Sequence, residues 1–329
     1  MQTRFFGGTG MRISGLAFGT MSFGHEADEA ESARLFDRCR DAGINLVDCA
    51  DVYGRGRAEE ILGRLIAPCR DELVLTTKGS FPMARDLNAC GASRYHMIRA
   101  CEASLRRLDT DRIDVYFLHR FDPRTDLEEA LRGLEQLVAQ GKILYPALSN
   151  FAAWQTQRAI DLQREMGWTK LACIQPMYNL LKRQVEVELL PMAEHNHVAV
   201  LPYSPLAGGL LTGKYALDVK PEVGRLLSSP SYQMRYGEST REQATRFVHF
   251  AREHGYEPTA LAIAWVAKHP AVTAPLLGAR SVAQLEACLK AADLVVDDST
   301  WTALDALLPA PPPATDRNDD GSEHDLWKR

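Results

Sequence analysis

The chain has 329 residues, of which 46% are hydrophobic and 25% charged, and its formal net charge is −5. This balance excludes a concentrated basic surface for nucleic acid or anionic membrane, and no apolar run is long enough to span a bilayer. The seven cysteines form no C-x-x-C pair, which argues against a zinc knuckle or a thioredoxin-like motif. Because the N-terminus also lacks the features of a signal peptide, we expect a cytoplasmic protein with reduced thiols.

Short apolar runs alternate with longer amphipathic segments along most of the chain. The predicted strands are Leu16–Gly19, Asn45–Asp48, Leu73–Lys78, Asp114–His119, Leu144–Asn150, Ala172–Gln175, Val198–Tyr203 and Ala274–Leu277. The clearest helical periodicity is in Glu29–Ala42, Met97–Leu108, Leu127–Gln140 and Thr240–His254. This alternation predicts an α/β fold, and eight strand–helix units favour a closed (β/α)₈ TIM barrel over an open doubly wound sheet. We expect residues 1–308 to form that single domain.

Three segments interrupt the alternation. Phe5–Ser14, with Gly7-Gly8-Thr9-Gly10 at its centre, predicts a β-hairpin that plugs the bottom of the barrel. The stretch from Ala216 to Arg241 has no clear period and predicts a long lid or binding loop on the C-terminal face. Residues 309–329 are Pro-rich and then polar, so we expect an extended tail in which Leu326-Trp327 is the candidate docking point.

Three consecutive predicted strands end in ionisable side chains. They are Asp48, Lys78 and His119, and Tyr53 follows Asp48 by five residues. Three of these residues also have an ordinary structural explanation. Tyr53 could be a loop residue, Asp48 a turn residue and His119 a core histidine with its hydrogen bonds satisfied. A lysine that closes a buried strand needs a counter-charge, however, and Asp48 on the neighbouring strand can provide it. Because strand C-termini face the active-site mouth of a (β/α)₈ barrel, this convergence favours a catalytic site.

With these residues in place, the sequence resembles the aldo-keto reductase family over about residues 3–295. The segment Asp48–Gly54 is similar to the family's D-x-A-x-x-Y-G signature. Further matches are Leu16–Met21, Gly141-Lys142, Leu148–Phe151, Gln175–Asn179 and Tyr203–Leu206. Within the family, the resemblance points to the branch near the potassium-channel β-subunit-like reductases.

The resemblance implies a catalytic tetrad of Asp48, Tyr53, Lys78 and His119. Carbonyl reduction needs a hydride donor and an acid for the developing alkoxide. Tyr53 would be that acid, with Lys78 lowering its pKa and Asp48 holding Lys78 charged and in place. His119 would hydrogen-bond and orient the carbonyl oxygen. The implied activity is NADP(H)-dependent reduction of an aldehyde or ketone to an alcohol, or the reverse dehydrogenation.

No G-x-G-x-x-G follows a strand, so a nicotinamide cofactor would have to lie in the barrel mouth rather than on a Rossmann fold. By resemblance, Tyr203 stacks on the nicotinamide, Lys214 contacts the pyrophosphate and Arg280 binds the 2′-phosphate. The full expected cofactor set is Gly19, Thr20, Met21, Asp48, Ser149, Asn150, Gln175, Tyr203, Ser204, Pro205, Leu206, Gly208, Lys214, Gly278, Arg280 and Gln284.

Two features qualify the cofactor expectation. Gly208–Lys214 imitates a G-x-x-x-x-G-K phosphate loop, but Tyr215 follows where Ser or Thr would bind Mg²⁺, so we reject an NTPase. Ala287-Cys288 stands where the family usually has Glu-Asn, which removes expected adenine contacts and leaves NAD(H) as an alternative cofactor.

The main alternative to an enzyme is a cofactor-binding regulatory protein of the channel β-subunit kind, which the Leu276-Leu277-Gly278 variant resembles. The presence of His119 favours catalysis, and a third hypothesis is a nicotinamide-free isomerase. We expect a small-molecule carbonyl or alcohol substrate, no nucleic-acid or membrane partner, and consider a homo-oligomer.

The sequence identifies no particular substrate. Met21, Phe23, Phe81 and Trp154 predict a partly apolar pocket, with simple packing as the alternative for Trp154. Arg55-Gly56-Arg57 is typical of a solvated loop, with a preference for an anionic substrate as the alternative. No metal is expected, because His195-Asn196-His197 has no third ligand nearby and is typical of a solvated turn.

Overall fold

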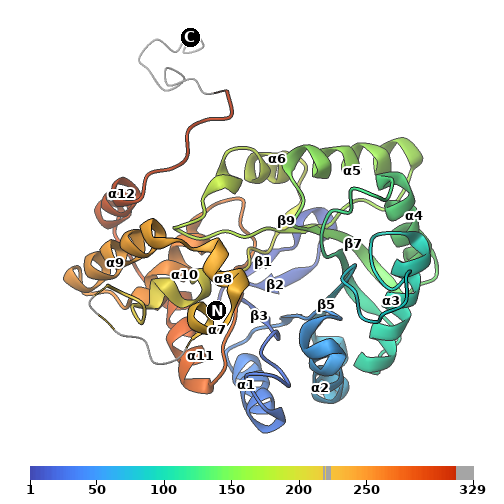
Figure 1. Cartoon of the computed structure of the whole chain (residues 1–329), viewed down its shortest axis with the longest axis horizontal. Helices are drawn as coiled ribbons and strands as arrows, with labels where there is room; N and C mark the ends of the chain where they lie inside the picture. Colours follow the sequence, from blue (N-terminus) through green and yellow to red (C-terminus); the bar gives the residue numbers. More distant parts are fainter. Residues whose placement is uncertain (218, 220–223, 316–329) are drawn as a thin grey trace.

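A computed structural model of the chain describes residues 1–217, 219 and 224–315. Its main feature is an eight-stranded parallel sheet in the order β10-β3-β4-β5-β6-β7-β8-β9 (Figure 1). The strands are β3 (Ala17–Gly19), β4 (Leu46–Asp48), β5 (Val74–Gly79), β6 (Ile113–Leu118), β7 (Ile143–Ser149), β8 (Cys173–Gln175), β9 (Ala199–Val200) and β10 (Leu276–Leu277). All eight lie within one or two residues of predicted runs or inside them, so the predicted fold class is confirmed.

The sheet curls until its first and last strands meet. Thr273 N, before β10, and Leu276 N, at the start of β10, donate to Val200 O and Pro202 O at 2.9 Å each. Val200 N donates in turn to Thr273 Oγ1 at 3.0 Å. The strands β9 and β10 have two residues each and are shorter than predicted. These bonds close the sheet into a (β/α)₈ barrel.

Helices surround the barrel. They are α1 (Glu29–Asp41), α2 (Arg57–Ile66), α3 (Arg94–Leu108), α4 (Leu127–Ala139), α5 (Ala153–Met166), α6 (Leu189–His195), α7 (Arg225–Ser228), α8 (Pro230–Arg235), α9 (Glu238–Glu253), α10 (Pro258–Lys268), α11 (Val282–Leu289) and α12 (Asp298–Leu307). The four periodic segments correspond to α1, α3, α4 and α9. No helix among the described residues is long and apolar enough to cross a membrane.

Alternation along β6 shows how the strands divide between two cores. Val115 and Phe117 belong to the cluster inside the barrel, whereas Tyr116 and Leu118 belong to the cluster between the sheet and the helices. Both faces of β6 are therefore buried, which is why this strand is an apolar run rather than an alternating pattern.

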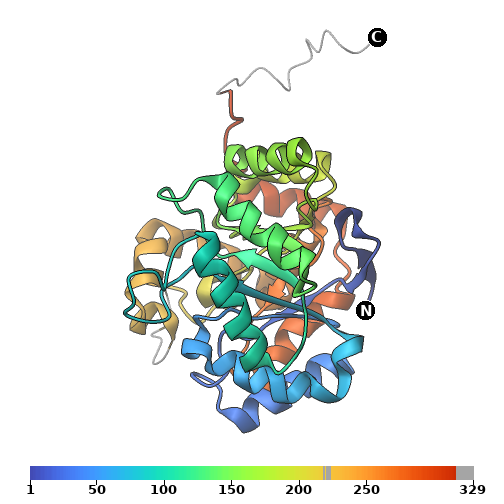
Figure 2. The same ribbon diagram turned by 90° about the vertical axis from the view of Figure 1, so that its right-hand side faces the viewer.

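The predicted N-terminal hairpin is present and closes the barrel. Strand β1 (Thr3–Phe5) pairs antiparallel with β2 (Arg12–Ser14). Phe6 and Ile13 are 0% exposed and join the cluster inside the barrel. Gly7 has φ +52° and lies so close to the turn before β9 that a Cβ would be 2.6 Å from His197 O. Figure 2 shows the hairpin in dark blue at one end of the barrel, opposite the yellow segments around α7 and α8.

The segment from Ala216 to Arg241 corrects one prediction. It was expected to be an irregular loop, but its described part contains α7, α8 and the start of α9. Pro230 opens α8 at a position where its missing N–H costs nothing. Because α7 and α8 are only four and six residues long, neither extends far enough to produce a recognisable period in the sequence. The Leu326-Trp327 prediction lies outside the described residues.

Candidate active site

A buried ion pair lies at the centre of the barrel mouth. Lys78 Nζ on β5 is 2.6 Å from Asp48 Oδ2 at the end of β4, and their side chains are 0% and 3% exposed. Lys78 also donates to Cys49 O at 2.6 Å. Asp48 Oδ1 accepts from Thr76 Oγ1 at 2.6 Å and from Gln175 Nε2 at 2.9 Å. Both charges are thus paired and hydrogen-bonded, as burial of charged groups requires.

The pair keeps Lys78 cationic. Burial by itself would lower the pKa of Lys78, but the charges of Asp48 and Tyr53 outweigh burial and raise this pKa above its ordinary value. Lys78 therefore remains an ammonium at neutral pH and directs a positive charge toward its remaining neighbour, Tyr53.

Tyr53 opens a short 3-10 helix after β4 and lines the mouth. Lys78 Nζ lies 5.2 Å from the centroid of its ring. Burial raises the pKa of Tyr53 to about 12, because the lowering by Lys78 is smaller than the combined raising by burial and Asp48. This corrects one expectation: Lys78 does act to lower the pKa of Tyr53, but the net shift is upward.

His119 follows β6 and completes the group. Its ring lies edge-on to Tyr53, with the centroids 6.2 Å apart, and edge-on to Phe81 at 4.7 Å. Burial, assisted by the charge of Lys78, holds the pKa of His119 well below its ordinary value, so the imidazole is neutral. Within the described part of the chain, its Nδ1 has no hydrogen-bond partner.

A second polar chain crosses the mouth beside this group. Tyr203 Oη donates to Asn150 Oδ1 at 2.7 Å, and Asn150 Nδ2 donates to Ser149 Oγ at 3.1 Å and to His119 O at 2.9 Å. Ser149 Oγ donates to Gln175 O at 2.9 Å. Asn150 and Ser204 hold left-handed backbones, with φ 59° and 57°. A left-handed backbone is strained at residues other than glycine, and such residues cluster at functional sites.

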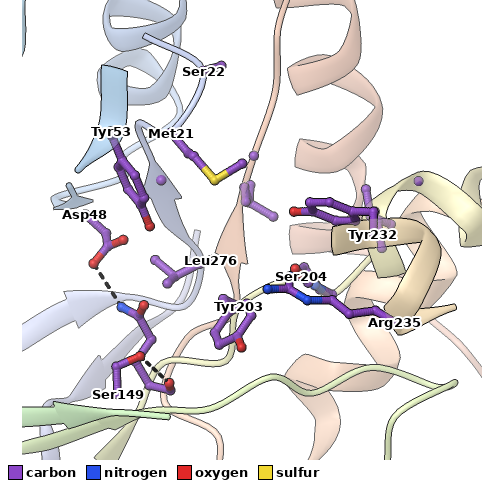
Figure 3. Close-up of a pocket in the computed structure, with 18 of the residues that line it drawn as sticks. Met21, Ser22, Asp48, Tyr53, Ser149, Tyr203, Ser204, Tyr232, Arg235 and Leu276 are labelled. Carbon is purple, nitrogen blue, oxygen red and sulfur yellow. Dashed lines mark hydrogen bonds between the residues drawn. The ribbon is translucent and has the colours of Figure 1, made fainter. Parts of the chain in front are cut away.

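These groups open into one cavity of 1130 Å³. Figure 3 shows Tyr53 and Asp48 on one side of it, Ser149 from the end of β7 and Tyr203 from the segment after β9, and Tyr232 and Arg235 facing them from α8. Of the predicted tetrad, Asp48, Tyr53 and His119 line the cavity, and Lys78 lies buried directly beneath.

The expected cofactor residues nearly all meet in this cavity. Those that line it are Gly19, Met21, Asp48, Ser149, Asn150, Gln175, Tyr203, Ser204, Pro205, Leu206, Gly208, Lys214, Gly278, Arg280 and Gln284. Thr20 does not, because it is fully buried and donates to Asp48 O at 3.0 Å.

Some predicted pocket residues lie elsewhere. Phe23 is fully buried in the core and Trp154 is 68% exposed on the surface, so of the four apolar candidates only Met21 and Phe81 line the cavity. Arg57 is engaged in ion pairs with Glu29 and Glu60 at 2.9 Å each. His197 forms the left-handed turn after α6, as the turn interpretation requires.

Other lining residues were not predicted individually, although two of them lie in the segment predicted to be a lid or binding loop. Tyr232 and Arg235 come from α8, inside the segment that has no period, and Arg120 and Phe121 come from the loop after β6. Arg120 adjoins His119 in the chain, and this adjacency was the one available signal for it.

The residues present fit a dinucleotide. Gly208 and Gly209 have φ +68° and +97°, and a Cβ on either would be within 2.8 Å of Tyr232 or Lys214 side-chain atoms. This loop therefore requires glycine, as backbone cradles for phosphates do. Lys214, Arg235 and Arg280 add positive charge to the cavity lining, and Ser149, Asn150 and Gln175 add amide and hydroxyl groups.

The comparisons agree with this geometry. A sequence model of the aldo/keto reductase family matches residues 15–309. An "uncharacterized oxidoreductase", YrpG of Bacillus subtilis, is 35% identical over 324 residues, covering 94% of this chain and 97% of the relative.

Two further relatives have more specific names. A probable voltage-gated potassium channel subunit beta of Arabidopsis thaliana is 34% identical over 304 residues, covering 90% of this chain and 92% of the relative. An L-glyceraldehyde 3-phosphate reductase of Escherichia coli is 34% identical over 308 residues, covering 87% of this chain and 86% of the relative. The chain therefore belongs to the aldo/keto reductase family. It is an oxidoreductase of that family's NAD(P)H-dependent, carbonyl-converting type.

Proposed function

We propose that the protein reduces an aldehyde or ketone with NADPH, or oxidises the corresponding alcohol, with Tyr53 as the proton-transferring residue. The observation that carries this proposal is the buried Lys78–Asp48 pair beneath Tyr53, with neutral His119 at its side. When bound, the reduced nicotinamide supplies the hydride to the carbonyl carbon.

The chain's own residues handle the proton. Tyr53 stays protonated at neutral pH because its pKa is raised to about 12, so it can donate its phenolic proton to the developing alkoxide. The Lys78 ammonium then stabilises the phenolate, and Asp48 keeps Lys78 charged and oriented. His119, neutral and edge-on to Tyr53, donates a hydrogen bond to the substrate oxygen and fixes its direction.

The test is consumption of NADPH against a panel of aldehydes and ketones, with Tyr53→Phe beside the native protein. The proposal is supported if the native protein turns over a carbonyl and Tyr53→Phe lowers kcat by at least about a thousandfold. NADPH should still quench the tryptophan fluorescence of the variant. A Tyr53→Phe variant that retains most of the native kcat contradicts it.

Preference for NADPH over NADH is assigned to Arg280. Its backbone N–H donates to Gln284 Oε1 at 3.1 Å, and its guanidinium lies 3.8 Å from Glu26 Oε1 with 28% of the side chain exposed. A rigid guanidinium in the cavity lining suits a phosphate. Ala287 and Cys288 also line the cavity and offer no side-chain amide or carboxylate to adenine.

The cofactor test is the Kd of each nucleotide for native protein and Arg280→Met. We expect the variant to bind NADPH about 10- to 100-fold more weakly and NADH nearly unchanged. Equal losses for both nucleotides would contradict the assignment to the 2′-phosphate.

A regulatory, channel β-subunit-like function is the second candidate, because three relatives carry that name and Leu276 and Leu277 line the cavity. Tight NADPH binding without turnover of any carbonyl or alcohol would favour it.

A further inference from the structure

Arg120 places a positive charge beside the proposed reaction centre. It directly follows His119 at the end of β6 and lines the cavity. Its guanidinium carbon lies 5.8 Å from the centroid of Phe81, and the Phe81 ring is itself edge-on to His119 at 4.7 Å. The Phe81 ring therefore lies against both the Arg120 guanidinium and the His119 imidazole.

The charges that line the cavity are strongly unbalanced. Among its described lining residues, the one carboxylate is Asp48, and Lys78 already neutralises it. The lining cations are Arg120, Lys214, Arg235 and Arg280. Three of them come from segments after β9 and β10, where the cofactor phosphates are proposed to bind. Arg120 alone comes from the loop after β6, on the side of His119 and Phe81.

The acidic residue closest in sequence does not neutralise Arg120. Asp122 Oδ2 accepts from Ala92 N at 3.0 Å and from Thr125 Oγ1 at 2.7 Å, and its Oδ1 accepts from Arg124 N at 3.0 Å. Both oxygens are committed to holding the loop. No ion pair of Arg120 occurs within the described part of the chain.

We propose that Arg120 recognises an anionic group on the substrate, so that the protein acts on carbonyl compounds that carry a phosphate or a carboxylate. This inference rests on the proposed function and specifies its substrate class. Phe81 and Phe121, which flank Arg120 in the cavity lining, contact the carbon skeleton between the anion and the carbonyl. A planar guanidinium binds either anion through paired N–H donors.

The test compares matched substrates in native protein and Arg120→Met. One pair is 4-carboxybenzaldehyde and 4-nitrobenzaldehyde, which have the same shape but differ in charge. The other is glyceraldehyde 3-phosphate and glyceraldehyde, so the two pairs separate a carboxylate-binding from a phosphate-binding site. Arg120 is solvent-exposed, so water weakens its attraction for an anion. We therefore expect Arg120→Met to lower kcat/KM about tenfold or more for the anionic member of at least one pair. The neutral members should change less than about threefold.

Arg124→Met is the matched control. Arg124 lies in the same loop, is also exposed, and is not among the cavity-lining residues. This variant should leave all four kcat/KM values near native, and Arg120→Lys should restore part of the anionic preference. Equal losses for charged and neutral substrates in Arg120→Met, or equal effects of Arg120→Met and Arg124→Met, would overturn the inference.

Binding decides the inference independently of turnover. With NADP⁺ saturating, calorimetric titration with 4-carboxybenzyl and 4-nitrobenzyl alcohol should show an Arg120-dependent preference for the carboxylate. If the native protein turned over no carbonyl, the proposed function would fail. The same titration would still support or reject a carboxylate-binding site at Arg120.

Discussion

The Lys78 ammonium and the Asp48 carboxylate form a 2.6 Å ion pair that is closed to solvent on both sides. Two separate strands provide the partners, and Thr76 and Gln175 occupy the other carboxylate oxygen. The pair is thus a structural element of the barrel as well as part of the proposed chemistry.

This pair predicts strong energetic coupling. Asp48→Asn and Lys78→Met should each lower the free energy of unfolding by about 3–5 kcal/mol. Each substitution removes one charge of the pair and leaves the other charge buried without its partner. The double variant should lose clearly less than the sum of the two. Urea denaturation of the three variants measures this coupling, and strictly additive losses would show that the two charges do not stabilise each other.

Asp51 predicts an unusual dependence of stability on pH. It is 1% exposed, and neither of its oxygens has a hydrogen-bond partner in the described part of the chain. Burial, with repulsion from Glu59, raises its pKa to about 7, despite opposing effects of Arg107 and Lys78. The unfolded pKa is near 3.9, so between pH 4 and 7 the folded protein holds more protons than the unfolded chain. The free energy of unfolding therefore falls as pH rises through this window.

Asp51→Asn removes that penalty. We expect the variant to be about 2–4 kcal/mol more stable than the native protein near pH 8, with the difference shrinking toward pH 5. Asp111→Asn, at a site where the carboxylate is 89% exposed, is the control and should show no such trend. An Asp51→Asn variant that is less stable at every pH would indicate that the ionised carboxylate is needed in the fold.

The two directions of the proposed reaction should respond differently to pH. With the pKa of Tyr53 at about 12 and that of His119 well below its ordinary value, both are neutral at physiological pH. We expect kcat/KM for reduction to be flat between about pH 6 and 9, and kcat/KM for alcohol oxidation to rise with pH as the phenolate fraction grows. His119→Asn should lower both profiles without changing their shape. A titration near pH 6.5 that disappears in His119→Asn would contradict a neutral His119.

The hairpin offers a matched pair of neighbouring phenylalanines. Phe6 is 0% exposed inside the barrel cluster, whereas Phe5 is 60% exposed. Phe6→Ala should lower the free energy of unfolding by about 3–5 kcal/mol and Phe5→Ala by less than about 1 kcal/mol. Thermal and urea unfolding measure both. Because the hairpin lies at the end opposite the mouth, folded Phe6→Ala should keep a near-native kcat/KM, and a loss of activity without loss of stability would contradict the plug interpretation.

Much of the fold was predictable because parallel strands buried on both faces are continuous apolar runs. The runs at residues 45–48, 73–78 and 114–119 each correspond to an observed strand, and the ionisable residue that ends each run reaches the mouth or lies just beneath it. Asp48 and Tyr53 are only five residues apart in the sequence, so they stay close together in the folded protein. The sequence by itself therefore determined the eight strand–helix units, the hairpin and the residues of the proposed tetrad.

Tertiary structure alone decided the properties that depend on distance and burial. Tyr232 and Arg235 line the cavity because α8 folds over it from far along the chain. Phe23 packs in the core whereas Phe81 lines the cavity, although each follows a barrel strand. The net pKa of Tyr53 depends on how much solvent is removed around it as well as on Lys78. Solvation and long-range contacts arise only when separate segments meet, so no local pattern encodes them.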